Sequence, residues 1–171
     1  MSRLIGSKQS ASLTDKVTSI TSSTNFTADA TAGVTPDCKL LVVAGGGGSC
    51  HGGGGAGGYR EIDPHPLPAS SVPVTIGAGG SGAPAENVRG STGSDSVFGS
   101  ATPITSAGGG GAGGLAVGGD SEALSGGSGG GGGGNAPTPT AAGAGNTPPV
   151  SPSQGNPGGT GRYNGTSRYT G

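Results

Sequence analysis

The strongest apolar run of the chain predicts a β-strand over residues 39–44. It reads Lys-Leu-Leu-Val-Val-Ala, is rich in β-branched and aliphatic side chains, and is followed at once by glycine. A continuous apolar run of this length is typical of a strand that is buried on both faces. We therefore expect residues 39–44 to lie at the centre of whatever core the protein has.

Three further strands are predicted downstream. Residues 71–76 alternate apolar and polar positions, which is the period of a half-buried strand. Pro73 lies inside this run and lacks a backbone N–H, so the strand is expected at the edge of a sheet. Residues 96–98 and 103–105 are shorter candidates.

The N-terminal residues 1–35 are rich in Ser and Thr and support two interpretations. Leu13, Val17 and Ile20 lie at i, i+4 and i+7, which is helical spacing. The many threonines instead favour an extended arm, and two helical turns are not stable alone. Both interpretations stay open from the sequence.

Uninterrupted glycine runs separate the predicted strands. They occupy residues 45–48, 52–55, 108–111 and 129–134. Polyglycine can adopt an extended left-handed helix with three residues per turn and no internal hydrogen bonds. Because its N–H and C=O groups must still find partners, such segments are expected to pack side by side and bond to one another. Residues 136–160 continue as a proline-rich extended segment.

The amino-acid composition indicates that the hydrophobic core is small. The 171 residues include 43 glycines and 13 prolines, while Leu, Ile, Val and Phe together make up about 14%. Only two of the glycines precede residue 45. The sequence therefore predicts a mainly β and irregular fold of short strands and packed polyglycine segments, with little helix and an oligomeric assembly.

Charge and hydropathy exclude several classes of partner. Eight basic and nine acidic residues leave a net charge of −1, which gives no electrostatic footprint for nucleic acid. No run of 18 apolar residues predicts membrane insertion, and the N-terminus lacks the apolar segment of a secretory signal. The expected partners are therefore proteins or glycans.

No constellation of residues predicts catalysis, a cofactor or a metal. Residues 77–82 match G-x-G-x-x-G, but proline and glycine interrupt the helix that a dinucleotide site needs. Cys38 and Cys50 are expected to be free thiols, although a disulfide would close a short loop. Cys50-His51 with His65 does not have the ligand spacing of a zinc site. The carboxylates are scattered singly, as Glu61, Asp63, Glu86, Asp95, Asp120 and Glu122, so no glycosidase pair is assigned and the chain is expected not to be an enzyme.

An Arg-Tyr pair occurs twice near the C-terminus, as Arg162-Tyr163 and Arg168-Tyr169. In a helix with three residues per turn, a spacing of six places both pairs on one side, about 19 Å apart. Arg and Tyr are favoured interface residues, so these four are candidate contacts to a neighbouring subunit or a surface glycan. Tyr59 and Arg60, which begin a loop expected over residues 59–73, are added to them.

The expected organisation has three parts. Residues 1–35 form an anchoring arm, residues 36–135 a glycine-rich domain of strands and polyglycine, and residues 136–171 a Pro- and Gly-rich extension. Besides residues 59–73, the loops expected to face outward are residues 83–106 and 135–157.

The order of these segments resembles the glycine-rich domains of bacteriophage tail fibres and tail-tip adhesins. The resemblance rests on residues 25–27, 33–35, 40–48, 54–59, 74–80, 93–99 and 108–111. It implies layered polyglycine helices whose connecting loops recognise the host. It also implies a homo-oligomer, with a trimer favoured, that contacts other virion proteins and a host surface glycan or protein.

The function expected from the resemblance is that of a non-enzymatic virion structural protein. It would be assembled in the host cytoplasm, lie on the virion surface and contribute to host attachment as a tail-fibre or adhesin subunit. The alternative is a capsid decoration, cement or head-fibre protein that stabilises the phage shell. An ice-binding protein is a weaker third reading, because no regular threonine array occurs.

Overall fold

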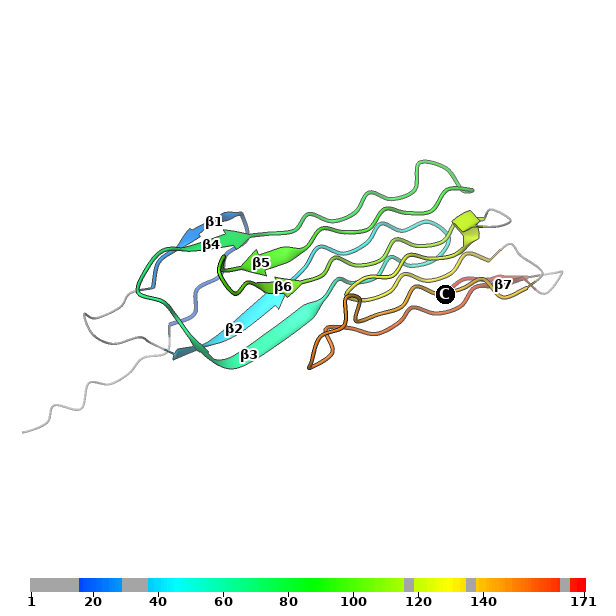
Figure 1. The fold of residues 1–171 in the computed structure, drawn as a ribbon. Helices are drawn as coiled ribbons and strands as arrows, with labels where there is room; N and C mark the ends of the chain where they lie inside the picture. The colour runs from blue at the N-terminus through cyan, green and yellow to red at the C-terminus, as the bar shows by residue number, and fades with distance from the viewer. Residues whose placement is uncertain (1–15, 29–36, 116–118, 135–137, 164–166) are drawn as a thin grey trace, which may run out of the picture.

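The fold is an elongated body with β-strands at one end and extended glycine-rich segments running to the other (Figure 1). The computed structural model describes residues 16–28, 37–115, 119–134, 138–163 and 167–171. We call the end that contains β1–β6 proximal and the opposite end, where β7 and β8 pair, distal. No α-helix occurs among the described residues, and none of their segments is a helix long and apolar enough to cross a membrane.

The proximal end contains a four-stranded antiparallel sheet. Its order is β1-β4-β5-β6. The strands are β1 (Thr24–Phe26), β4 (Val72–Thr75), β5 (Ser96–Phe98) and β6 (Ile104–Ser106). The predicted strands at residues 71–76, 96–98 and 103–105 are thus confirmed, the last one shifted by one residue.

The predicted edge position of the strand around Pro73 is wrong. This strand is β4, and it lies between β1 and β5. The amide of Gly99 donates to the Pro73 carbonyl (3.0 Å), and β5 ends at Phe98. Gly99 has a φ of 95°, which belongs to a turn. An inner strand therefore tolerates proline here because its missing N–H falls where the neighbouring strand ends.

A second, two-stranded sheet pairs β2 (Asp37–Val43) with β3 (Tyr59–Pro66). Strand β2 confirms the predicted strand over residues 39–44. The expectation that both of its faces are buried is wrong, because Leu41 and Val43 are each 52% exposed while Val42 is 8% exposed. The loop predicted over residues 59–73 is also wrong over its first half, since this stretch forms β3.

The hydrophobic core is small and lies between these two sheets. Phe98 is its only buried aromatic side chain, and its ring contacts Phe26 (6.4 Å between centroids) and, edge-on, His65 (5.6 Å). The buried members are Val42, Val72, Val74 and Phe98, and the partly buried ones are Ile20, Phe26, Leu40, Leu67, Ile76 and Ile104. The apolar core therefore occupies only the proximal end.

The rest of the molecule is held together by hydrogen bonds between glycine-rich segments. They run side by side in Figure 1 and comprise residues 44–49, 52–58, 77–83, 90–95, 107–114, 121–126, 127–134, 140–146 and 154–161. Segment 107–114 is central. The carbonyls of residues 107–113 and the amides of residues 109, 110, 112 and 113 are bonded to neighbouring backbone segments. The amides of residues 107 and 108 donate to the side chains of Gln154 and Asp95. Residues 107–114 are all buried, and Ala112 has 0% exposure.

The bonds of the central segment repeat every three residues. The carbonyls of residues 107, 110 and 113 accept from the amides of residues 58, 55 and 52, at 2.7, 2.8 and 3.2 Å. The amides of residues 109 and 112 donate to the carbonyls of residues 45 and 48, at 2.9 and 3.0 Å. The amides of residues 110 and 113 donate to residues 128 and 131, both at 2.9 Å. This is the period of the polyglycine II helix, so the expected intersegment pairing is confirmed.

Close backbone approach explains why these segments are glycine. A Cβ atom built on Gly110 would lie 1.7 Å from the carbonyl oxygen of Leu124, and one on Gly47 would lie 2.1 Å from that of Gly110. At Gly79, on the outer segment 77–83, the nearest atom would be 3.7 Å away. On this segment the inward-facing Gly77 and Gly80 would also collide with backbone, at 2.0 and 2.2 Å, so glycine is a packing requirement there and in the bundle interior but not at Gly79.

The predicted mainly β and irregular fold class is confirmed. The oligomeric assembly stays a prediction. Residues 16–20, which the helical spacing included, form no helix, and residues 1–15 lie outside the described residues. The division into residues 1–35, 36–135 and 136–171 stays a prediction.

We predict that Gly110→Ala destabilises the protein and that Gly79→Ala does not. The first Cβ forces backbone atoms apart in the bundle interior, and overpacking of this kind costs typically about 1–3 kcal/mol or more. The second restricts only the unfolded chain and is expected to be neutral or slightly stabilising. Thermal unfolding followed by circular dichroism measures both. Equal losses of stability in the two variants would contradict the packing account.

Candidate interaction surfaces

The two C-terminal Arg-Tyr pairs face each other in a hairpin. Strand β7 (Arg162–Tyr163) pairs with β8 (Arg168–Tyr169), with Arg162 opposite Tyr169 and Tyr163 opposite Arg168. The prediction that they lie about 19 Å apart on one side of an extended helix is therefore wrong. The chain reverses between them, and the Asn-Gly dipeptide at residues 164–165 is a hairpin-turn sequence that could have indicated this. Arg162 is exposed and Tyr169 is 55% exposed.

The outer face of the β2–β3 sheet carries most of the large exposed hydrophobic side chains of the described residues. Leu41 and Val43 on β2 and Tyr59 on β3 are each about half exposed, and Val43 lies directly opposite Tyr59. Leu41 lies opposite Glu61. Alternation along the strands adds Asp37, Lys39 and Asp63, all exposed, to this surface. We call these seven residues the β2–β3 face.

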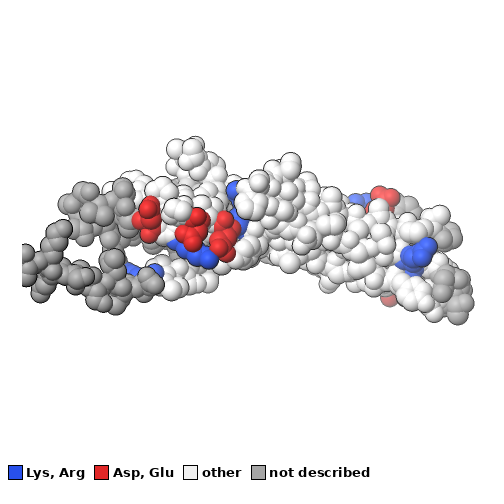
Figure 2. All heavy atoms as spheres, turned by 90° about the horizontal axis from the view of Figure 1, so that it is seen from below, with Lys and Arg blue, Asp and Glu red and all other residues white. Residues whose placement is uncertain are grey.

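Acidic atoms gather on this part of the molecule, with basic atoms between them (Figure 2). Lys39 Nζ lies 2.7 Å from Glu61 Oε1, and the Tyr59 hydroxyl donates to Glu61 Oε2 (3.0 Å). The hydrogen bond with Lys39 lowers the pKa of Glu61 below its ordinary value, and that with Tyr59 adds to this. The same carboxylate raises the pKa of Lys39 and of Tyr59. The face therefore keeps three charged or polar groups in one arrangement at neutral pH.

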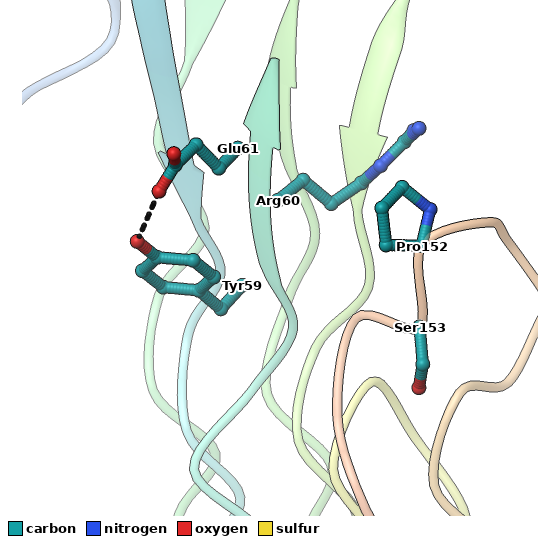
Figure 3. Close-up of a pocket in the computed structure, with 5 residues that line it drawn as sticks. All are labelled: Tyr59, Arg60, Glu61, Pro152 and Ser153. Carbon is teal, nitrogen blue, oxygen red and sulfur yellow. Dashed lines mark hydrogen bonds between the residues drawn. The ribbon is translucent and has the colours of Figure 1, made fainter. Parts of the chain in front are cut away.

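A small pocket lies beside this face (Figure 3). Tyr59, Arg60, Glu61, Pro152 and Ser153 line it, and its volume is about 110 Å³. Tyr59 and Glu61 point to one side of β3, whereas Arg60 points to the other, where its guanidinium donates to the Thr105 carbonyl (3.3 Å). Ligand pockets for small molecules usually measure about 300–1,000 Å³, so this hollow is better suited to receiving one side chain of a partner.

Gln154 fixes the turn that forms one wall of this pocket. Its side chain accepts from the Ala107 amide (2.8 Å) and donates to the Pro148 carbonyl (2.8 Å). The backbone carbonyl of Gln154 accepts from the Tyr59 amide (2.8 Å). Gln154 is only 2% exposed, so it joins β3, the central glycine segment and the turn in one buried connection. The sequence offered no sign of this role, since a single glutamine in a Pro-rich stretch is ordinary.

The distal end carries the loops that connect the glycine segments. Arg89 Nε lies 3.0 Å from Asp120 Oδ1, which ties loop 84–89 to the short 3₁₀ helix η1 (Gly119–Ser121). The Leu115 amide donates to the Glu86 carbonyl (2.6 Å), and the Cys50 thiol lies 3.6 Å from the same oxygen. The distal loops therefore form one connected surface, with Glu86 exposed on it.

The structure also places the cysteines and the G-x-G-x-x-G match that the sequence singled out. Cys38 and Cys50 are free thiols, as expected. Burial, with Asp37 and Asp63 nearby, raises the pKa of the Cys38 thiol, which keeps it protonated and poorly nucleophilic. The G-x-G-x-x-G match at residues 77–82 lies within a glycine segment, where Gly80 donates to Gly46. No group of three metal-ligating side chains occurs in the part of the chain that the structure describes.

The comparison with known families identifies the class of this protein. The glycine-rich domain family matches residues 20–171, so the chain belongs to this family. The match covers both the strands and the polyglycine bundle. No curated protein and no solved structure matches the chain.

We predict that Lys39→Met raises the pKa of Glu61 toward its ordinary value. Tyr59→Phe removes only the second hydrogen bond and should raise it less. Because the folded pKa is lowered, the interaction stabilises the fold above the ordinary glutamate pKa of about 4.3 and is lost as the pH falls through the folded value. NMR titration of the Glu61 side chain measures the midpoint. An unchanged midpoint in Lys39→Met would contradict the ion pair.

We predict that Gln154→Ala destabilises the fold by about 1–3 kcal/mol, because the buried Ala107 amide loses its acceptor. Ser153→Ala is the matched control, since Ser153 is exposed on the same turn. Urea denaturation of both variants measures the difference. If the control lost as much stability as Gln154→Ala, the buried connection would not be the cause.

Proposed function

We propose that this chain is a non-enzymatic structural protein of a bacteriophage virion, a tail-fibre or adhesin subunit that contributes to host-cell attachment. It would lie on the virion surface, contact other virion proteins and recognise a host surface glycan or protein. The single observation that carries the proposal is an uncharged body of glycine segments, which we call the shaft, with charged and polar side chains at its two ends.

The shaft has the properties of a spacer. Residues 44–58, 77–85, 107–115 and 123–161 contain no Lys, Arg, Asp or Glu, and the middle of the molecule is accordingly uncharged in Figure 2. Its segments are bonded to one another every three residues, which restricts bending. A rigid, neutral spacer has few side chains that could bind a substrate, but it holds a distal surface away from the proximal end.

The distal surface supports a role in recognition. Loops positioned by a rigid scaffold are the usual site of binding residues. Here loop 84–89 and η1 bring the charged residues Glu86, Arg89 and Asp120 together in a chain that is otherwise poor in charge. The order of strands and glycine runs that resembles phage adhesins is the second support.

The proposal is tested with particles of the virus that encodes this chain. We expect antibodies against the chain to label the tail in electron micrographs and to block adsorption, and excess purified protein to compete. Glu86→Lys with Asn87→Ala on the distal loop should reduce adsorption at least tenfold without lowering the melting temperature. The control is Thr92→Lys, which adds a charge to an exposed residue of the shaft.

The position of the antibody label distinguishes the attachment role from the alternative, which is capsid decoration. Label on the head, with particles that lose shell stability when the protein is absent, would overturn the attachment role in favour of capsid decoration. Unlabelled particles would contradict both.

A further inference from the structure

Apart from Val17, the large exposed hydrophobic side chains of the described residues lie on two surfaces of opposite charge. Among the described residues, the large exposed hydrophobic side chains are Val17, Leu41, Val43, Tyr59 and Tyr169. Three of them lie on the β2–β3 face and one on the β7–β8 hairpin. Exposed apolar clusters of this kind, rimmed by polar residues, mark interaction sites.

The charges of the two surfaces are complementary. The β2–β3 face has three carboxylates and one ammonium group, and only Glu61 is paired, with Lys39. Asp37 and Asp63 form no ion pair with a described residue. The hairpin carries two arginines and no acid, and Arg162 likewise has no ion pair among the described residues.

The two surfaces cannot meet within one molecule. The β2–β3 face lies at the proximal end, whereas the hairpin lies at the distal end, with the uncharged shaft between them (Figures 1 and 2). A contact between them therefore requires two copies.

We propose that the β2–β3 face of one copy binds the β7–β8 hairpin of a second copy. The face supplies a hydrophobic surface beside an acidic rim, and the hairpin supplies exposed tyrosine and arginine, the residue types enriched in interface centres. The small pocket beside Tyr59 can receive a side chain of the hairpin. Because the two surfaces differ, the contact is heterologous, and copies add head to tail in a ring or a linear assembly.

The first test is self-association of the purified chain by sedimentation velocity. The weight-average mass should rise with concentration at low ionic strength. The association constant should fall at least tenfold at high salt, since exposed charges are screened beyond about 10 Å at 0.1 M. A chain that stays monomeric at all concentrations and low salt overturns the proposal.

The second test uses one variant on each surface. Leu41→Glu places a charge on the face at a half-exposed position, and Arg162→Glu reverses the hairpin charge. Each variant alone should be monomeric and keep the melting temperature of the unmodified chain. An equimolar mixture should form pairs and nothing larger, because only one intact face and one intact hairpin remain for each pair.

Thr92→Glu on the shaft is the control and should associate like the unmodified chain. Association that survives both single variants, or a mixture that stays monomeric while the unmodified chain associates, overturns the proposal. This result does not depend on the proposed attachment role, which the labelling and adsorption experiments test separately.

Discussion

Most of this molecule depends on hydrogen bonds between backbones that approach too closely for any side chain. Fixing a residue costs roughly 1–2 kcal/mol, and glycine loses the most conformational freedom. An apolar core of a few residues at one end cannot offset that cost along the whole chain. The intersegment bonds of the glycine bundle take over this role, and the missing Cβ atoms make them possible.

This close packing also determines where large functional side chains can lie. Inside the bundle a side chain would collide with a neighbouring carbonyl, as at Gly110. Charged and aromatic residues therefore lie mainly on the strands and in the loops at the distal end. Asp95 in segment 90–95 is an exception, and its carboxylate accepts from the Gly108 amide (2.8 Å). The separation of shaft from interaction surfaces follows from packing, and both proposals made above rest on it.

The junction between the two parts is the place where ordinary side-chain chemistry matters most. Gln154 supplies the acceptor that the Ala107 amide needs where the strands give way to glycine segments. Ser106, next to it, is fully buried, and its hydroxyl has no hydrogen-bond partner among the described residues. The backbone of the junction thus depends on one buried glutamine and is sensitive to its loss.

Local patterns predicted the parts of the fold that depend on local properties. The apolar run over residues 39–44, the alternation around Pro73 and the glycine runs each have one physical meaning, and the structure contains the corresponding elements. Strand β3 was missed because its prolines and charged residues are typical of loops, while its pairing with β2 is a long-range contact. Gln154 was missed for the same reason, since Ala107 is distant in sequence. The pairing of β7 with β8 is local and was missed because the Arg-Tyr spacing was interpreted as an extended helix.

Hydrogen exchange of individual glycine amides tests the central claim most directly. The amides of Gly109 and Gly110, which are bonded inside the bundle, should exchange slowly, at a rate close to that of global unfolding. The amide of Gly79 on the outer row, which has no acceptor among the described residues, should exchange rapidly in the same sample. Rapid exchange at Gly109 and Gly110, with protection confined to the strands, would contradict the view that glycine backbone bonding forms the core of this protein.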